Sequence, residues 1–396
     1  RVFSLVVGLS LLACLAGRVR ADAALIASAL PSGARVAVLS LSGAQTAALT
    51  LALRSPFPPG SDASRVFLKA LASLLRQRLA CGLPRESVAP PHRPTLATVV
   101  SVREPLLLLT LTTGQERAAE ALAALAASPQ QLLQVSAEEV ARALEAPTIL
   151  RRSTTEAAFA LLLEPSARLE DAPMAVGDFL AALPLALSPS NLTLAASLPG
   201  DSSEFARSVV SILGTMGGEG SAAEQVIRPA QVLQQVGRTD EWTDLSMVLV
   251  HPVESSVDLA ALQLASALLA HARFSRLFSA ARSAAALTYD IDSSVQALGT
   301  LGAISVRCTI ARGRASEALT LLSAQVRSLA ASGPAEGELE AAKRFVAFEQ
   351  DRLRDRPAQW SQQAAVWVGN FGPKILDLSP EEALHSIKAE DMAEFL

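Results

Sequence analysis

The segment Gly217–Ser221, GGEGS, divides the chain into two halves that repeat one plan of strands and helices. Three glycines in five residues offer few side chains to bury, so this segment is typical of a linker. A length of 396 residues is enough for two or three domains. The sequence therefore predicts two domains of one plan, over residues 24–216 and 230–396, joined by a linker over residues 217–229.

In the first half, apolar residues that alternate or recur every three to four positions predict both strands and helices. We expect strands after the Pro31–Gly33 turn and at residues 46–54, 95–102, 106–112 and 191–198, and helices at residues 62–81, 114–128, 137–145, 154–163 and 202–213. Asp62 or Ser61 is the expected N-cap of the first helix.

The second half starts the order again. We expect strands at residues 244–251, 287–296 and 303–312, and helices at residues 258–285, 315–332 and 338–354, with a last helix from Ser379. Pro380 and two acids favour that last helix start. These patterns predict an α+β fold in which helices pack on one face of each sheet.

Composition excludes several classes of function. The formal net charge of -4 gives no general basic signal for nucleic acid. Cys14, Cys81 and Cys308 are far apart and fit neither a disulfide framework nor a CxxC site. The chain has only 4 histidines, and none has a second metal ligand at suitable helical spacing. No G-x-S-x-G segment predicts a serine nucleophile.

The stretch Ser275–Ser294, SRLFSAARSAAALTYDIDSS, contains the only tyrosine of the chain, Tyr289, seven residues after Arg282. It resembles a segment of the zinc metallopeptidase family M16, which includes insulinase, pitrilysin and the mitochondrial processing peptidase. That family has the pattern S-R-L-F-x-x-x-R-E-x-x-G-L-A-Y at this place. In place of the glutamate and the glycine of this pattern, the chain has Ser283 and Ala286.

The resemblance extends over about residues 30–396, and it implies two domains of the LuxS/MPP-like metallohydrolase fold, each with a mostly antiparallel sheet. In this family the arginine and tyrosine hold the substrate backbone across from a zinc ion. The resemblance therefore implies a substrate-binding role for Arg282 and Tyr289. It also suggests that one more strand and helix would follow Leu396, which predicts a truncated C-terminal end.

Active members of the family have H-x-x-E-H in the first helix, where two histidines bind zinc and the glutamate activates water. This chain has Val66, Lys69 and Ala70 at the corresponding positions. Aliphatic side chains cannot ligate zinc, and a lysine at neutral pH is a cation that cannot act as the base. We therefore expect no zinc and no catalytic residue in this chain, although zinc is the cofactor of the family.

An apolar run at residues 4–17 is too short to span a bilayer, and it is followed by Ala21–Asp22–Ala23. This order predicts a secretory signal peptide over residues 1–23 whose start is missing, and export to a bacterial periplasm or cell envelope. Lipidation of Cys14 and a mitochondrial location stay open as alternatives.

Three functions stay open on the sequence. The first is an inactive M16 subunit that holds unfolded peptide and pairs with a chain bearing H-x-x-E-H. The second is a structural scaffold that resembles the core proteins of respiratory complex III. The third, an enzyme with a displaced metal site, has the least support because metal ligands are scarce.

Overall fold

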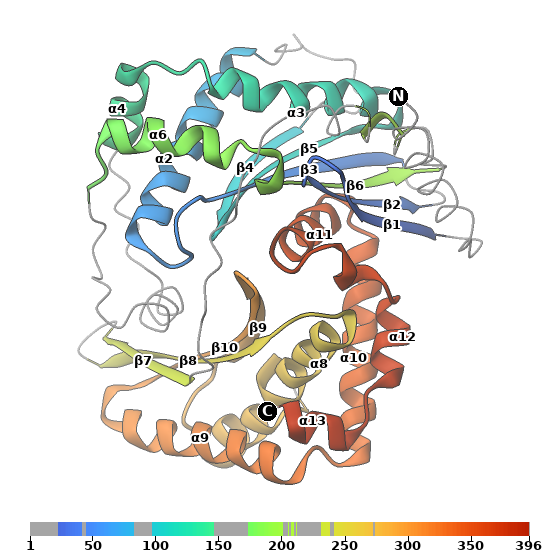
Figure 1. The fold of residues 1–396 in the computed structure, drawn as a ribbon. Coiled ribbons are helices and arrows are strands. Elements are labelled where there is room, and N and C mark those ends of the chain that lie inside the picture. Colours follow the sequence, from blue (N-terminus) through green and yellow to red (C-terminus); the bar gives the residue numbers. More distant parts are fainter. Residues whose placement is uncertain are drawn as a thin grey trace, which may run out of the picture.

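The computed structural model of the chain describes residues 23–41, 45–82, 97–145, 173–200, 205, 207–209, 211, 231–237, 241–271 and 274–395. These residues form two β-sheets, one in each half of the chain, with helices around them (Figure 1). The predicted α+β fold is confirmed. Residues 1–22, the predicted helix at 154–163 and the predicted linker lie outside the described residues.

The first sheet has the strand order β1-β2-β6-β3-β5-β4 and is antiparallel except for the β2–β6 pair. Its strands are β1 (Ala23–Ala29), β2 (Arg35–Leu41), β3 (Thr46–Arg54), β4 (Ala97–Arg103), β5 (Leu106–Gly114) and β6 (Leu192–Pro199). The helices whose bounds the structure describes in this half include α2 (Asp62–Gly82), α3 (Ala118–Leu132), α4 (Ala137–Glu145) and α6 (Val176–Ala186).

Helix α2 begins where the sequence predicted it. The Ser61 hydroxyl accepts a hydrogen bond from the Ser64 amide at 3.1 Å, which caps the first turn. Apolar residues at helical spacing, among them Phe67 and Leu71, face the sheet and are fully buried. They pack with Leu49 and other leucines of β3, β5 and β6 in the core of the first domain.

The second sheet has the order β7-β8-β10-β9 and is antiparallel. Its strands are β7 (Gln231–Gly237), β8 (Trp242–Pro252), β9 (Ile291–Leu298) and β10 (Leu301–Ala311). The helices are α8 (Ser256–Ser266), α9 (Ala315–Ser332), α10 (Glu336–Arg354), α11 (Pro357–Phe371), α12 (Pro380–Ser386) and α13 (Ala389–Phe395). The Ser379 hydroxyl accepts from the Glu382 amide at 3.2 Å, which caps α12 as predicted.

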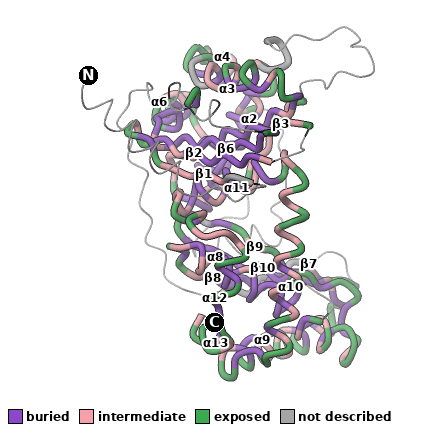
Figure 2. Tube along the Cα trace, turned by 90° about the vertical axis from the view of Figure 1, so that its right-hand side faces the viewer, coloured by how far each residue is buried: buried purple, intermediate pink, exposed green. Residues whose placement is uncertain are grey.

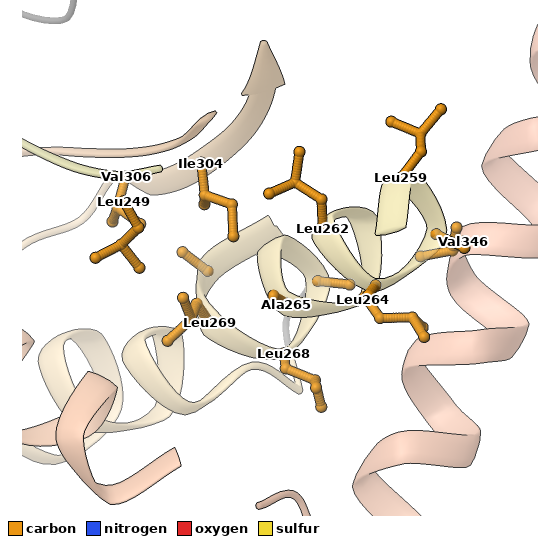
Figure 3. Close-up of a cluster of buried hydrophobic side chains, with 14 of the residues drawn as sticks. Leu249, Leu259, Leu262, Leu264, Ala265, Leu268, Leu269, Ile304, Val306 and Val346 are labelled. Atoms are coloured by element: carbon orange, nitrogen blue, oxygen red, sulfur yellow. The ribbon is translucent and has the colours of Figure 1, made fainter. Parts of the chain in front are cut away.

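One face of the second sheet packs on α8. Leu249, Ile304 and Val306 extend from the strands toward the helix, and Leu262 and Leu269 of α8 and the turn after it lie opposite them (Figure 3). The other side of α8 faces α10. Leu259 and Leu264 of α8 lie on this side with Val346 of α10.

Helix α11 lies on the second face of the first sheet, although it belongs to the other half of the chain (Figure 1). Thr50 Oγ1 is 2.9 Å from Ser361 Oγ and 3.0 Å from Thr110 Oγ1, so hydroxyl groups of the two halves meet in the buried contact. A methyl group on Gly369 would lie only 3.2 Å from Leu106 Cδ1. The sequence did not predict this helix, which buries the face that helices of the first domain leave open.

Two arginines of the first sheet bind the C-terminal end of α11. Arg35 and Arg54 both donate to the backbone oxygen of Gly369, and Arg54 also donates to Asn370 Oδ1 at 3.2 Å. The last carbonyl groups of a helix have no partner within it and carry partial negative charge, so cationic donors stabilise them. Buried residues run through β2 and β6 beside this contact, whereas many residues of the outer helices are exposed (Figure 2).

Candidate functional site

The candidate site lies between α8 and β9, where the sequence predicted a single helix over residues 258–285. That prediction is wrong, because the helix is interrupted after η3, a wider π-helical turn at Ala267–His271. The chain turns and starts a new helical segment, η4 (Phe278–Ala284). The Ser275 hydroxyl accepts a hydrogen bond from the Phe278 amide at 3.4 Å, and a serine that bonds a nearby amide favours such a new start.

Arg282 lies on the exposed side of η4. Its guanidinium carbon is 4.9 Å from the centroid of the Phe278 ring, which is a cation–π contact. No ion pair joins Arg282 to a carboxylate among the described residues. Its charge is therefore available to a further group.

Tyr289 is 85% exposed, more than any other large hydrophobic residue among those the structure describes. Its neighbour Thr288 is buried, and Thr288 Oγ1 lies 2.7 Å from the backbone oxygen of Thr309 on β10 and 2.8 Å from that of Asp290. Leu287 is buried as well. The backbone around Tyr289 is thus fixed to the sheet while the phenol ring projects into solvent.

The turn between Arg282 and Tyr289 contains Ala286 in a left-handed conformation, with φ of 46°. This is the position where the family pattern has glycine. Arg314 binds the turn, donating to the backbone oxygens of Ala286 at 3.1 Å and Ala285 at 3.2 Å, and it is held in place by Glu317 at 2.8 Å. Arg314 was not predicted, since it lies 28 residues after Ala286 and no local pattern links them.

Replacing Ala286 with glycine is expected to raise the free energy of unfolding by about 1 kcal/mol. A left-handed conformation costs an L-residue with a Cβ roughly 1–2 kcal/mol, and the greater freedom of glycine in the unfolded chain offsets part of that gain. The urea midpoint measures the change. Ala285→Gly is the control, because Ala285 is right-handed and its replacement should lower the midpoint. A lower midpoint for Ala286→Gly would contradict the strain argument.

Arg276, the first arginine of the family pattern, has a structural role here. It donates to both carboxylate oxygens of Glu338, at 2.9 and 3.3 Å, and to the backbone oxygen of Gly333 at 3.0 Å. The hydrogen bond from Arg276 lowers the pKa of the Glu338 carboxyl. These contacts join η4 to the start of α10 and support the segment that presents Arg282.

His271, the last residue of η3, lies beside β9. Its Nδ1 is 3.0 Å from Asp292 Oδ1 and 2.7 Å from the backbone oxygen of Ser293. The hydrogen bond with Asp292 is the largest cause that raises the pKa of His271, and burial opposes it. The same hydrogen bond lowers the pKa of Asp292. This pair was not predicted, because its members are 21 residues apart.

The Asp292→Asn variant is expected to lose stability mainly between about pH 4 and pH 6.5. The contribution of His271, whose pKa is raised, is complete below its unfolded pKa and is lost as the pH rises through its folded pKa. The contribution of Asp292 is present above its unfolded pKa and is lost as the pH falls through its folded pKa. Since both side chains are partly exposed, we expect at most about 1 kcal/mol. Urea midpoints at pH 5.5 and pH 8.5 test this, and an equal loss at both would contradict it.

The positions that correspond to the zinc site lie on α2. Ala70 is buried against the domain core, and Val66 and Lys69 are partly buried. Among the residues that the structure describes, no group of three or more His, Cys, Asp or Glu side chains could hold a metal ion. The side chains on α2 therefore do not fit the zinc of the family.

The structure does not bring α2 and Tyr289 together. Gly299, in the turn between β9 and β10, lies against Pro59 just before α2, where an added methyl would be 3.5 Å from Pro59 Cγ. Tyr289 precedes the opposite end of β9. The eight residues of β9 place these two ends roughly 25 Å apart. Within one chain, the Arg282 and Tyr289 element is thus remote from the start of α2.

The remaining candidate residues have structural surroundings. His251 ends β8, as predicted, and its ring stacks on Phe395 at 4.0 Å. Cys308 is buried in β10, and burial together with nearby Asp244 and Asp290 raises its pKa to about 12, which disfavours a reactive thiolate. Across the described ranges, no helix combines the length and apolar character needed to cross a membrane.

Comparisons with known proteins show what the chain is similar to. Residues 230–346 match the family model described as peptidase M16 inactive domain. No curated protein matches the chain. The crystal structure of a peptidase M16 inactive domain from Pseudomonas fluorescens has a TM-score of 0.67 at 14% identity, and the match covers 94% of this chain and 93% of that one.

Two other solved structures are similar. A chain of complex III2 from Candida albicans, with Inz-5 bound, has a TM-score of 0.68 at 15% identity and covers 94% of this chain and 92% of its own. The periplasmic protease PqqL from Escherichia coli has a TM-score of 0.55 at 16% identity, covering 96% of this chain but 45% of its own. The resemblance inferred from residues 275–294 is thereby confirmed: residues 230–346 match the model of the peptidase M16 inactive domain, and the chain as a whole has the fold of M16-like proteins.

Proposed function

We propose that this chain is a non-catalytic M16 subunit that holds unfolded peptide with Arg282 and Tyr289. In this proposal a second M16 chain with H-x-x-E-H supplies the zinc ion and the catalytic glutamate. This chain requires no cofactor of its own, because Val66, Lys69 and Ala70 do not fit zinc.

The observation that carries the proposal is the exposure of Tyr289 on a fixed backbone. A large aromatic side chain that is 85% exposed contributes little to the core. The backbone beside it is nevertheless held in place, because Thr288 bonds to the sheet and Arg314 bonds to Ala286. The Arg282 guanidinium has several N–H donors, and a tyrosine hydroxyl can donate or accept. Together these groups match the carbonyl and amide groups of an extended peptide.

The distance between Tyr289 and α2 supports pairing with another chain. The roughly 25 Å along β9 is too long for Arg282, Tyr289 and the start of α2 to bind one short peptide segment. A zinc helix that acts on peptide held by Arg282 and Tyr289 would therefore come from a partner subunit. The family match supports such a pairing, since the chain has the fold of M16-like proteins without the zinc ligands.

We infer export to a bacterial periplasm or cell envelope. The apolar run at residues 4–17 and the Ala21–Asp22–Ala23 pattern support a signal peptide. The similarity in fold to a periplasmic protease agrees with this location.

Affinity purification of the chain from its own host tests the proposal. We expect an H-x-x-E-H chain to copurify, and the complex to cleave unfolded peptides. Arg282→Ala and Tyr289→Phe should each lower the rate of cleavage about 10- to 100-fold, which corresponds to roughly 1.4–2.7 kcal/mol, of the order of one lost hydrogen bond. Arg327→Ala, which changes an exposed arginine on α9, is the matched control. Purification without such a chain, or unchanged cleavage in both variants, would overturn the proposal.

The alternative is a structural scaffold. It is favoured by the similarity, over nearly the whole length of both chains, to a chain of complex III2. A scaffold would copurify with respiratory-chain proteins and bind no peptide. Stoichiometric zinc in the isolated chain would instead favour the third function, a displaced metal site.

A further inference from the structure

Exposed aromatic side chains gather beside the candidate site. Phe348 on α10 is 60% exposed, and Phe274, just before η4, is 39% exposed. Phe345 lies one helical turn before Phe348, and its ring centroid is 6.0 Å from that of Phe274, with the two rings at 77°. We name Phe274, Phe345 and Phe348 the aromatic ridge.

The polypeptide connects this ridge to Arg282. Phe278, which follows Phe274 by four residues, is partly buried against the core and lies under the Arg282 guanidinium. Rings one helical turn apart on a helix have Cβ atoms about 5–6 Å apart. Phe278 thus lies between Phe274 and Arg282 along the chain, and its ring contacts the Arg282 guanidinium.

The two parts of this surface differ in the chemistry they need. Exposed aromatic rings gain free energy when apolar groups cover them, and adjacent exposed rings are typical of binding surfaces. Arg282 has no carboxylate partner among the described residues, so a bound carboxylate would add a charge-assisted hydrogen bond. The surface therefore suits one ligand that has apolar side chains and a carboxylate close together.

We propose that the aromatic ridge selects extended peptides with large apolar side chains a few residues away from a carboxylate that pairs with Arg282. The inference rests on the proposed function and specifies its substrate class. An acidic side chain and a free C-terminus both provide this carboxylate. Tyr289 contacts the backbone, and Phe348 and Phe274 contact the apolar side chains.

Fluorescence anisotropy with labelled ten-residue peptides tests the proposal. The full chain is isolated from its host with any copurifying subunit. The first peptide contains two phenylalanines and one aspartate in a Gly/Ser background and ends in an amide. A second has serine for both phenylalanines, a third has asparagine for the aspartate, and a fourth replaces the aspartate by a free C-terminal carboxylate.

We expect the first peptide to bind at least tenfold more tightly than the second or third. Equal binding of the first and fourth would show that either carboxylate serves, and binding by one alone would identify the source. Phe348→Ser should weaken binding of the first peptide five- to tenfold and leave binding of the phenylalanine-free peptide unchanged. Leu133→Ser, which changes an equally exposed residue of the first domain at 53% exposure, is the control and should change neither. Arg282→Ala should weaken binding of both peptides and abolish the preference for the peptide with aspartate over the peptide with asparagine.

The outcomes distinguish failure of the ridge proposal from failure of the proposed peptide-holding function. If Arg282→Ala weakens binding and Phe348→Ser does not, the ridge proposal is wrong and the peptide-holding function stands. If no peptide binds, or none responds to Arg282→Ala, both are wrong. If Phe348→Ser releases a copurifying subunit and peptide selectivity stays the same, the ridge is a subunit contact and the proposal fails.

Discussion

Replacing Gly302 with alanine is expected to lower the free energy of unfolding by about 2 kcal/mol, within the range for overpacked cores. A Cβ atom at this position would lie 2.4 Å from Leu262 Cδ2 and 2.6 Å from Val253 Cγ2, well inside van der Waals contact. Both neighbours are almost fully buried, so neither side chain has free space to move into. The added methyl must therefore displace the side chains of Leu262 and Val253, which strains the contact between α8 and β10.

The matched control is Gly337→Ala. Gly337 lies in α10, where nothing is found within 4 Å of an added Cβ. The same substitution should there raise stability by about 0.5 kcal/mol, because alanine favours a helix over glycine. Urea midpoints of the two variants should move in opposite directions. An unchanged or higher midpoint for Gly302→Ala would show that the contact between α8 and β10 is not tightly packed.

Arg54→Ala is expected to cost about 2–3 kcal/mol. The substitution removes the hydrogen bonds to Gly369 and Asn370 and leaves the end of α11 with Arg35 as its cationic donor. Removing Arg54 also relieves two costs, the burial of its charge and its repulsion from Arg35. Both effects lower the pKa of Arg54 to about 10. At neutral pH the arginine nevertheless stays protonated. Unsatisfied buried carbonyl groups cost about 1–3 kcal/mol each. We therefore expect the lost hydrogen bonds to outweigh the stability gained by removing the buried charge.

Fluorescence provides a local measurement, because two of the three tryptophans, Trp360 and Trp367, lie in α11. We expect the tryptophan signal of Arg54→Ala to change at lower urea than in the original chain. Arg54→Lys keeps the charge without the fork of donors and should show about half of the shift. If Arg54→Ala unfolds at the original midpoint, Arg54 does not hold α11 on the first sheet.

Much of the fold could be predicted because its elements are local and strongly patterned. The helix at residues 315–332 and the capped start of α12 at Ser379 follow from spacing and from residues close in sequence. β1, β7, α6 and α11 were missed. Strand β1 is alanine-rich and gives little pattern, and α11 is specified by contacts with strands far earlier in the sequence, such as the hydrogen bond from Gln362 to Thr110, 252 residues apart.

The site was predictable only in part. The pattern at residues 275–294 led to Arg282 and Tyr289 by family resemblance. Both side chains are exposed, as binding to a peptide would require. The partners that fix this segment, Thr309 and Arg314, come from β10 and the turn after it, so only the folded chain reveals them. The break after His271 was also missed, because alanine-rich sequence favours a continuous helix. Tertiary contacts in this place outweigh helix propensity.

The position of α11 also determines the order in which a ribosome can complete the molecule. Strands β2, β3, β5 and β6 leave the exit tunnel long before residues 357–371 are synthesised. Until then the face with Ala52, Leu106 and Leu108 has no cover from α11. A nascent first half is therefore an incomplete folding unit with an open apolar sheet, which is prone to aggregate. Release of a nascent chain that stops before α11 would yield a product in need of chaperones, even though all six strands of its sheet are present.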